Sequence, residues 1–185
     1  MSGSERNLDK NRIEQLLREL GARLNALGLY AEMSILGGSA VALVFDASRS
    51  TADIDAIFQP RDIVFDEAAA MAEELGLAPD WLNDSVSFYL PRVPDPAPRV
   101  LAEWPGLTVS TPSPEYLLAM KALVTRKSPA DLQDAAVICQ HLGLFDELKI
   151  EKVAREFYPT GSFGAQELWF EDIAYRAQQL RDSDN

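Results

Sequence analysis

Apolar residues recur at three- and four-residue spacing near the start of the chain. The members of this series are Ile13, Leu16, Leu17, Leu20, Leu24 and Leu27. This period places their side chains on one face of a helix. Gly28 follows at the position where a left-handed residue commonly ends a helix. We therefore predict an amphipathic first helix that ends near Gly28.

Between residues 31 and 110 the hydrophobic pattern changes several times between the strand period and the helix period. Asp53–Phe58 alternates polar and apolar side chains, as a half-buried strand does. The expected elements are a strand over 31–36, a short buried helix over 40–45, a strand over 53–58, a helix over 62–75 ended by Gly76, and strands over 86–90, 100–104 and 107–110. The prolines at 91, 94, 96 and 98 predict an exposed connection, because proline is poorly tolerated inside central strands.

From Ser113 onward the pattern is helical. Ser113-Pro114 and Ser128-Pro129 are each typical of an N-cap residue followed by proline at the first helical position. The expected helices cover 115–125, 130–142, 146–157 and 166–180. The sequence thus predicts an α+β fold. A core of mixed strands and helices takes up residues 1–112, and a helical C-terminal part, residues 113–185, packs on this core.

The composition suits one buried core, because the chain has 185 residues and is 47% hydrophobic. No run approaches the roughly 18 apolar residues that a membrane helix needs, and residues 1–12 lack the apolar stretch of a secretory signal. Cys139 is the only cysteine, so an internal disulfide is excluded. We expect a cytoplasmic protein that does not associate with membranes.

The charge balance bears on the class of partner. The chain has 17 Lys and Arg against 29 Asp and Glu, a net charge of -12. A protein that binds nucleic acid through phosphates normally carries a basic face. The overall composition provides no basic face, although cations in the middle of the chain could form a local basic patch. The cations that could form it are Arg49, Arg61, Arg92, Arg99, Lys121, Arg126 and Lys127.

Two short motifs could carry chemistry, Gly38-Ser39 and Asp53-x-Asp55. Carboxylates one residue apart on a strand point to the same face, where they could bind Mg²⁺ together with substrate phosphates. With Gly37, the Gly-Ser motif forms the run Gly37-Gly38-Ser39, which follows a strand and opens a helix. There glycine lets the backbone approach a phosphate, and Ser39 and the helix N-terminus offer donors. One motif attracts metal and the other attracts the phosphates that the metal bridges.

These motifs carry a resemblance to a known superfamily. The run LGGSAVALVFDASRSTADIDAIF, residues 36–58, resembles the GS…DxD signature of the minimal nucleotidyltransferases, relatives of DNA polymerase beta. Within that superfamily the chain is most similar to the AbiEii and MenT-like toxins and to uncharacterised relatives of them. The narrower match rests on APDWLND, PSPEYLLAMKALVTR and DLQDAAVI, which begin at residues 78, 112 and 131. The resemblance covers roughly residues 35–142 and implies a minimal nucleotidyltransferase core, which is a small mixed sheet with flanking helices.

The resemblance implies roles for residues of the two motifs. The metal-binding carboxylates of the family fall on Asp53 and Asp55, which would hold Mg²⁺ or Mn²⁺. The phosphate-binding Gly-Ser of the family falls on Gly38 and Ser39. In the toxin branch a Ser or Thr commonly precedes the first aspartate by two residues, and here that residue is Thr51, a third nucleotide-binding candidate. A strand-starting role for Thr51 is the alternative.

Further candidates lie in the helical part. The lysine that contacts the nucleotide triphosphate in this branch matches Lys121, and the downstream catalytic aspartate corresponds to Asp131 or Asp134. Each has a structural alternative. Lys121 could be a surface lysine that emerges from an apolar helix, and Asp131 could serve the helix cap at Ser128. Either aspartate could also pair with Lys127 instead.

Other polar residues have weaker indications. Arg49 could reach a phosphate or be an exposed loop arginine. Glu103, on a later strand, is a minor candidate for a third carboxylate. Trp81 with Asn83 indicates packing and a turn, with a base-stacking pair as the alternative. His141 indicates a core or capping residue, with a general base as the alternative.

The resemblance implies transfer of a nucleoside monophosphate from a nucleoside triphosphate to an acceptor hydroxyl. For the toxin branch the implied acceptor is an RNA 3′ end, particularly tRNA, or a protein hydroxyl, with a cognate antitoxin as partner. The acidic net charge favours a small cationic acceptor instead, as in the antibiotic nucleotidyltransferases. A nucleotide-binding or interaction module without catalysis is the alternative from another class.

Overall fold

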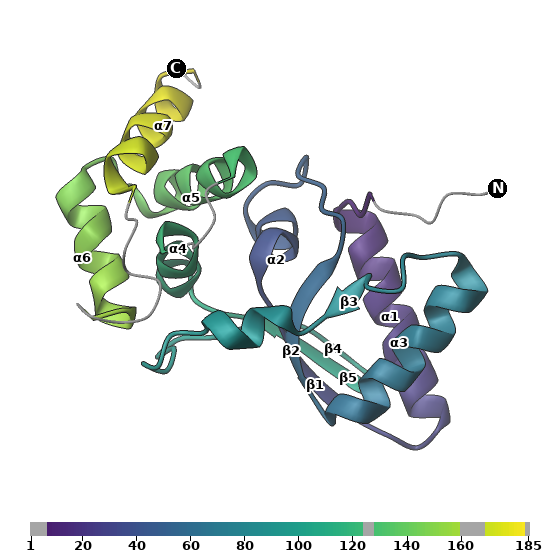
Figure 1. Ribbon diagram of the computed structural model, residues 1–185. Coiled ribbons are helices and arrows are strands. Elements are labelled where there is room, and N and C mark those ends of the chain that lie inside the picture. Colours follow the sequence, from purple (N-terminus) through teal and green to yellow (C-terminus); the bar gives the residue numbers. More distant parts are fainter. Residues whose placement is uncertain (1–6, 124–127, 160–168, 184–185) are drawn as a thin grey trace. The chain divides into compact units, whose positions relative to one another are not determined.

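The structure is a computed structural model that describes residues 7–123, 128–159 and 169–183. These residues form two compact units (Figure 1). The first unit comprises those of Met1–Phe88 and Pro98–Thr111, and the second comprises those of Tyr89–Ala97 and Pro112–Asn185. The second unit therefore includes the proline-rich connection as well as the C-terminal helices. The domain boundary between residues 112 and 113 stays a prediction.

The first unit is built on a five-stranded mixed sheet in the order β3-β2-β1-β5-β4. The strands are β1 (Ala31–Ile35), β2 (Ile54–Gln59), β3 (Leu82–Asn83), β4 (Arg99–Trp104) and β5 (Leu107–Thr111). β1 pairs antiparallel with β2 and parallel with β5, so β1 is the centre of the sheet. β3 runs parallel to β2, and β4 runs antiparallel to β5. The α+β prediction with a mixed sheet is confirmed.

Three helices of this unit are α1 (Lys10–Ala26), α2 (Gly37–Val44) and α3 (Arg61–Leu75). Asp9 begins α1 by accepting a hydrogen bond from the backbone N–H of Arg12 at 2.8 Å. α1 contacts α3, β4 and β5, and α3 contacts β2. Alternate strand residues are buried, among them Met33, Ile35, Ile54, Ala56, Phe58 and Val109. The period-two pattern of the sequence thus predicts the buried face of the sheet.

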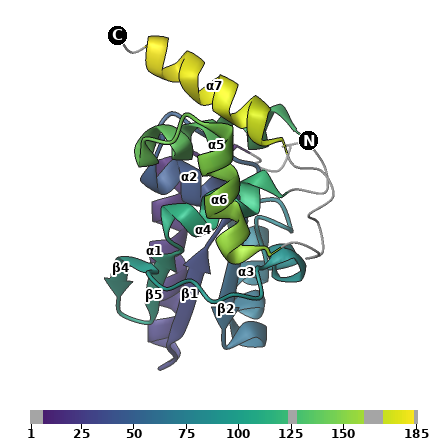
Figure 2. The same cartoon turned by 90° about the vertical axis from the view of Figure 1, so that its left-hand side faces the viewer.

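The second unit is helical, with α4 (Pro114–Ala122), α5 (Pro129–Leu142), α6 (Glu147–Phe157) and α7 (Phe170–Ser183). α4 packs against α5 and α6, and α7 packs against α5 and α6 (Figure 2). The predicted caps are confirmed, because Ser113 Oγ accepts from Tyr116 N and Ser128 Oγ accepts from Asp131 N. Two hydrogen bonds that the sequence did not predict join the proline-rich connection to the start of α4. Asp95 accepts hydrogen bonds from Ser113 N at 2.6 Å and from Ser113 Oγ at 2.8 Å.

Two local predictions differ from the structure. The strand expected over 86–90 is wrong, because Ser85–Tyr89 forms a short 3₁₀ helix, η1. This turn begins with hydrogen bonds that point back along the chain, from Ser87 N to Asp84 O and from Ser85 N to Asn83 Oδ1. The two-residue strand β3 was missed, since it is too short to show a period. The expected helix end at residues 124–125 and the start at 166–168 lie outside the described residues.

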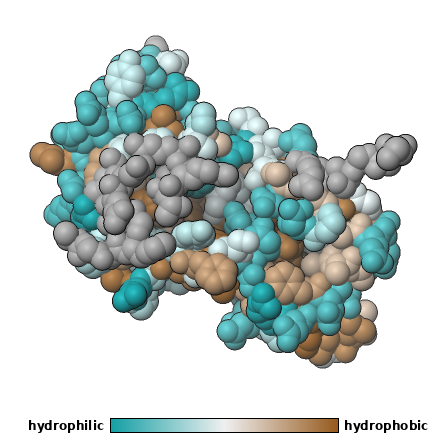
Figure 3. All heavy atoms as spheres, in the orientation of Figure 1, coloured by the Kyte–Doolittle hydropathy of each residue, from teal (hydrophilic) through white to brown (hydrophobic). Residues whose placement is uncertain are grey.

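The described surface carries some exposed hydrophobic side chains. In the first unit they include Leu27 and Tyr30, which follow α1 and are 58% and 53% exposed, and Phe88, which is 83% exposed. Figure 3 shows hydrophobic atoms gathered at the end of α1. No helix among the described residues combines the length and hydrophobicity that a bilayer-spanning segment needs.

Candidate functional site

The two carboxylates of Asp53-x-Asp55 lie where β2 begins. Asp53 immediately precedes the strand, Asp55 is its second residue, and both side chains are partly buried. The backbone oxygen of Asp55 accepts from Leu36 N at 2.8 Å. Because β1 and β2 run antiparallel, this places the start of β2 beside the end of β1 and the start of α2. The two sequence motifs therefore lie next to each other in the first unit.

Gly37 makes the contact between α2 and Asp55 sterically feasible. Its φ is +60°, which favours glycine, and a Cβ atom built there would lie 2.4 Å from Asp55 Oδ2. Leu36, the N-cap residue of α2, makes no side-chain capping hydrogen bond. A carboxylate therefore lies at a helix N-terminus, where the partial positive charge of the helix dipole stabilises it. Gly37 lies between a strand and a helix, as the sequence predicts for the glycines of this motif.

Gly38 brings two donor side chains close to the same helix terminus. A Cβ atom built on Gly38 would lie 3.0 Å from Nη2 of Arg49 and 3.2 Å from Oγ1 of Thr51. Arg49 is partly buried, and its guanidinium also donates to the backbone oxygen of Ser50. Of the two interpretations of Arg49, the one that makes it an exposed loop arginine is therefore wrong. A guanidinium and a hydroxyl next to helix N–H groups form a setting suited to phosphate oxygens.

The loop that carries Thr51 is held by the segment before α1. Leu8 and Thr51 form an antiparallel bridge, with Leu8 N to Thr51 O at 2.8 Å and Thr51 N to Leu8 O at 3.0 Å. Leu8 is fully buried. This bridge fixes the chain two residues ahead of Asp53. Thr51 therefore lies before β2, and its nucleotide-binding role stays a prediction.

Ser39 lies in the first turn of α2 and is 1% exposed. Its hydroxyl donates to the backbone oxygen of Leu36 at 2.8 Å. The side chain thus braces the start of the helix from inside the unit. The nucleotide-binding roles of Gly38 and Ser39 stay predictions.

Asn83 contacts the carboxylate pair from the next strand. It lies opposite Asp55 in the parallel register of β2 and β3, and its Nδ2 donates to Asp53 Oδ2 at 2.9 Å. The turn interpretation is confirmed, since its Oδ1 accepts from Ser85 N at 3.1 Å. Packing of Trp81 is confirmed as well, because the ring is fully buried and Nε1 donates to Ala68 O at 2.9 Å. Sequence reasoning missed the contact between Asn83 and Asp53, which depends on strand order.

The donor chemistry of this cluster fits a hard divalent cation. Asp53 and Asp55 offer carboxylate oxygens, which Mg²⁺ prefers, with substrate phosphates and water completing its shell. Among the described residues no group of three or more His, Cys, Asp or Glu side chains could hold a metal. Glu103 as a third carboxylate is wrong, because β4 is separated from β2 by β1 and β5. We call the set Gly37, Gly38, Arg49, Thr51, Asp53, Asp55 and Asn83 the carboxylate cluster.

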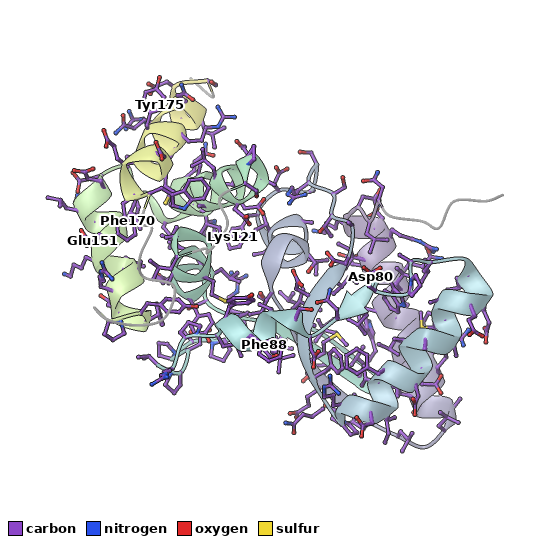
Figure 4. All side chains as sticks on the ribbon, viewed as in Figure 1. Asp80, Phe88, Lys121, Glu151, Phe170 and Tyr175 are labelled. Atoms are coloured by element: carbon purple, nitrogen blue, oxygen red, sulfur yellow. The ribbon has the colours of Figure 1, made fainter. Side chains whose placement is uncertain are left out.

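A second cluster lies within the helical unit. Lys121 of α4 (labelled in Figure 4) makes ion pairs with two aspartates of α5, Nζ to Asp131 Oδ1 at 2.7 Å and to Asp134 Oδ2 at 2.9 Å. The side chains of Lys121, Asp131 and Asp134 are 12%, 25% and 1% exposed. The interpretation of Lys121 as a surface lysine is therefore wrong. We call these three residues the lysine cluster.

The residues of the lysine cluster are held by contacts inside the second unit. Burial alone would lower the pKa of Lys121, but the charges of Asp134 and Asp131 outweigh it and the pKa is raised. Asp131 also accepts from the hydroxyl of the cap residue Ser128 at 2.6 Å, so its structural interpretation as part of the cap is confirmed. Lys127, the other partner proposed for these aspartates, lies outside the described residues. The catalytic roles of Lys121, Asp131 and Asp134 stay predictions.

Comparison with known families decides the class of protein. A family described as nucleotidyltransferase of unknown function (DUF6036) matches residues 11–176. The chain belongs to this family. No curated protein and no solved structure gives a significant match.

Membership of this nucleotidyltransferase family has consequences at a coarse level. The matched range contains the carboxylate cluster and the lysine cluster. The chain is a transferase by class, and a nucleotide is its substrate. The superfamily resemblance is confirmed at this level, whereas the closeness to AbiEii and MenT-like toxins stays a prediction.

Proposed function

We propose that this chain transfers a nucleoside monophosphate from a nucleoside triphosphate to an acceptor hydroxyl, using a divalent cation held by Asp53 and Asp55. The observation that carries the proposal is the meeting of these two carboxylates with the start of α2. Membership of a nucleotidyltransferase family supports it.

Asp53 and Asp55 would hold Mg²⁺ or Mn²⁺, which supplies charge neutralisation on the phosphates when bound. The remaining work belongs to the residues of the chain. The N-terminus of α2, with Arg49 and Thr51 beside Gly38, presents donors to the phosphate oxygens. Positioning and electrostatic stabilisation of this kind can provide most of the rate in phosphoryl chemistry.

The reaction balances without a further reactant. The acceptor oxygen forms a bond to the α-phosphorus, and the bond from that phosphorus to the oxygen bridging to the β-phosphate breaks. Pyrophosphate leaves with that electron pair, and the acceptor hydroxyl loses its proton to a base. A carboxylate of the pair Asp53 and Asp55 is our candidate for that base.

Lys121 enters the proposal differently from the carboxylate cluster. It is mostly buried and shared by two carboxylates, so a phosphate would have to compete with Asp131 and Asp134 for it. A structural role of Lys121, as the ion-pair partner of the two aspartates, should therefore be tested first. Contact with the triphosphate, which the toxin resemblance implies, is the second.

For the acceptor we propose an RNA 3′ end, particularly that of tRNA, or a protein hydroxyl, in a toxin that acts with a cognate antitoxin. This proposal rests on the resemblance to the toxin branch. One observation favours a small cationic acceptor instead. The net charge is -12. In addition, Arg61 and Lys121, two of the cations that could form a local basic patch, make ion pairs with aspartates. Arg126 and Lys127 lie outside the described residues.

The test is incubation of the purified chain with each α-³²P-labelled nucleoside triphosphate, Mg²⁺ and total RNA, with and without cell protein. We expect label to enter a tRNA-sized band with the wild-type chain only. An Asp53→Ala, Asp55→Ala double variant should transfer nothing. A matched control is Asp62→Ala, Asp66→Ala, which removes two carboxylates from exposed positions of α3. This control should transfer label at the wild-type rate.

The outcomes separate the acceptors. Label in protein would establish nucleotidylation of a protein. If neither RNA nor protein is labelled but an aminoglycoside is, a small-molecule acceptor would replace the toxin proposal. Transfer by the Asp53, Asp55 double variant would refute the assignment of the metal site. Metal-dependent nucleotide binding without any turnover would favour the non-catalytic module.

A further inference from the structure

Asn83 is a side chain outside the two sequence motifs that reaches the carboxylate pair through Asp53. Its Nδ2 lies 2.9 Å from Asp53 Oδ2, across 30 positions of sequence. The orientation of the amide follows from its partners. A backbone N–H such as that of Ser85 can only donate, so the atom that it meets at 3.1 Å is the amide oxygen. The other end of the amide, which faces Asp53, is therefore the NH₂ group.

The segment that carries Asn83 is anchored on both sides of the residue. Ile54 N donates to Trp81 O at 2.7 Å, which joins the start of β2 to the residue before β3. Trp81 itself is fully buried and hydrogen-bonded to Ala68. On the other side the Ser85 contact fixes the amide. Asn83 thus presents its NH₂ group to Asp53 from a backbone that has little freedom to move.

We propose that Asn83 is a positioning residue that orients the Asp53 carboxylate for the metal ion, an inference that rests on the proposed function. A neutral donor suits this task. It holds one oxygen of the carboxylate and stabilises its charged form, yet adds no negative charge of its own. Hydrogen-bonding partners behind metal ligands commonly set the ligand orientation, and losing one typically weakens metal binding 10- to 100-fold.

A merely structural contact is the competing explanation. In that case Asn83 would only tie β3 to β2, and its loss would affect stability without a specific effect on the metal. The neighbouring residue Asp84 provides the comparison. Asp84 directly follows Asn83 in the sequence, and its Oδ2 lies 2.6 Å from Nε of Arg61. Loss of Asp84 loosens the same segment and removes a nearby negative charge.

The experiment measures binding of Mn²⁺ alone to the full chain, by the electron paramagnetic resonance signal of free Mn²⁺. The variants are Asn83→Ala and Asn83→Leu, of which the second keeps the side-chain volume. Asp84→Ala is the matched control, and the Asp53→Ala, Asp55→Ala double variant defines the background. Thermal unfolding without metal verifies that each variant is folded. We expect the Mn²⁺ dissociation constant to rise about 10- to 100-fold in both Asn83 variants and to stay within twofold in Asp84→Ala.

Nucleotide transfer adds a second readout. A positioning role predicts that saturating Mn²⁺ restores most of the lost rate of the Asn83 variants, which a general loosening would not do. Wild-type affinity in both Asn83 variants would overturn the inference and leave the metal site standing. Equal weakening in Asp84→Ala would overturn it as well. If the wild type binds Mn²⁺ no better than the Asp53, Asp55 double variant, the metal site itself fails and the inference with it.

Discussion

The lysine cluster allows a sharp test of its structural role through the substitution Lys121→Met. Methionine keeps the length and packing of the side chain but removes the cation between Asp131 and Asp134. Asp134 is 1% exposed, so water cannot replace the lost partner. Breaking a buried ion pair by removing one partner costs about 3–5 kcal/mol, because the remaining charge stays buried without its counter-ion. Asp131 is 25% exposed and keeps its Ser128 contact, so it adds only about 0–1 kcal/mol.

A local probe is already present for this measurement. Cys139, the only cysteine, lies on α5 with both aspartates and is fully buried. The rate at which a thiol reagent labels Cys139 reports the free energy of opening of the second unit when opening is faster than labelling. A loss of about 3–5 kcal/mol corresponds to labelling that is roughly a hundred to several thousand times faster, since about 1.4 kcal/mol is a factor of ten. Addition of Asp134→Asn to Lys121→Met should recover most of this loss.

The direction in which stability changes with pH follows from the pKa of Lys121. The pKa of Lys121 is raised in the folded chain, so its stabilisation is fully present below the ordinary lysine pKa and is lost as the pH rises through the raised value. Labelling of Lys121→Met within threefold of the wild-type rate at pH 7 would refute the reasoning. Loss of transfer in a Lys121 variant of unchanged stability would assign Lys121 to the nucleotide.

Three further results are expected. Gly37→Ala should weaken Mn²⁺ binding at least tenfold and lower the melting temperature, because the new Cβ atom would lie 2.4 Å from Asp55 Oδ2 at a positive φ; wild-type binding would contradict the tight contact. Native Cys139 should resist alkylation at pH 8, where thiol reagents label free cysteine readily, because burial raises its pKa to about 12; rapid stoichiometric labelling would show that α5 is open. Asp95→Ala should destabilise the second unit by about 1–3 kcal/mol and speed proteolysis within residues 89–97, because two hydrogen bonds from Ser113 are lost; an unchanged cleavage rate would argue against this anchor.

Much of the fold could be predicted from local patterns. The periodic leucines locate α1, the alternation of apolar residues locates β2, and Gly76 ends α3 in the left-handed conformation. The Ser-Pro pairs locate the starts of α4 and α5, and both serines cap as expected. Each signal involves residues within about four positions of one another, so it survives without knowledge of the rest of the chain.

The candidate site divides along the same line. Asp53 and Asp55, together with the glycines of α2, could be recognised because their chemistry is concentrated in short motifs. The part played by Asn83 could not, since its contact with Asp53 depends on β3 pairing parallel with β2. Glu103 had the right chemistry for a third ligand, but the strand order places β4 three positions from β2.

The sequence by itself determined the helix and strand periods, the caps and the nucleotidyltransferase motifs of this chain. Only the tertiary structure decided that Lys121 pairs with both Asp131 and Asp134, and that Arg49 lies beside Gly38. The physical reason is range. Periodicity and capping arise from contacts within a turn or a pleat, whereas ion pairing and ligand support depend on which distant segments the packed core brings together.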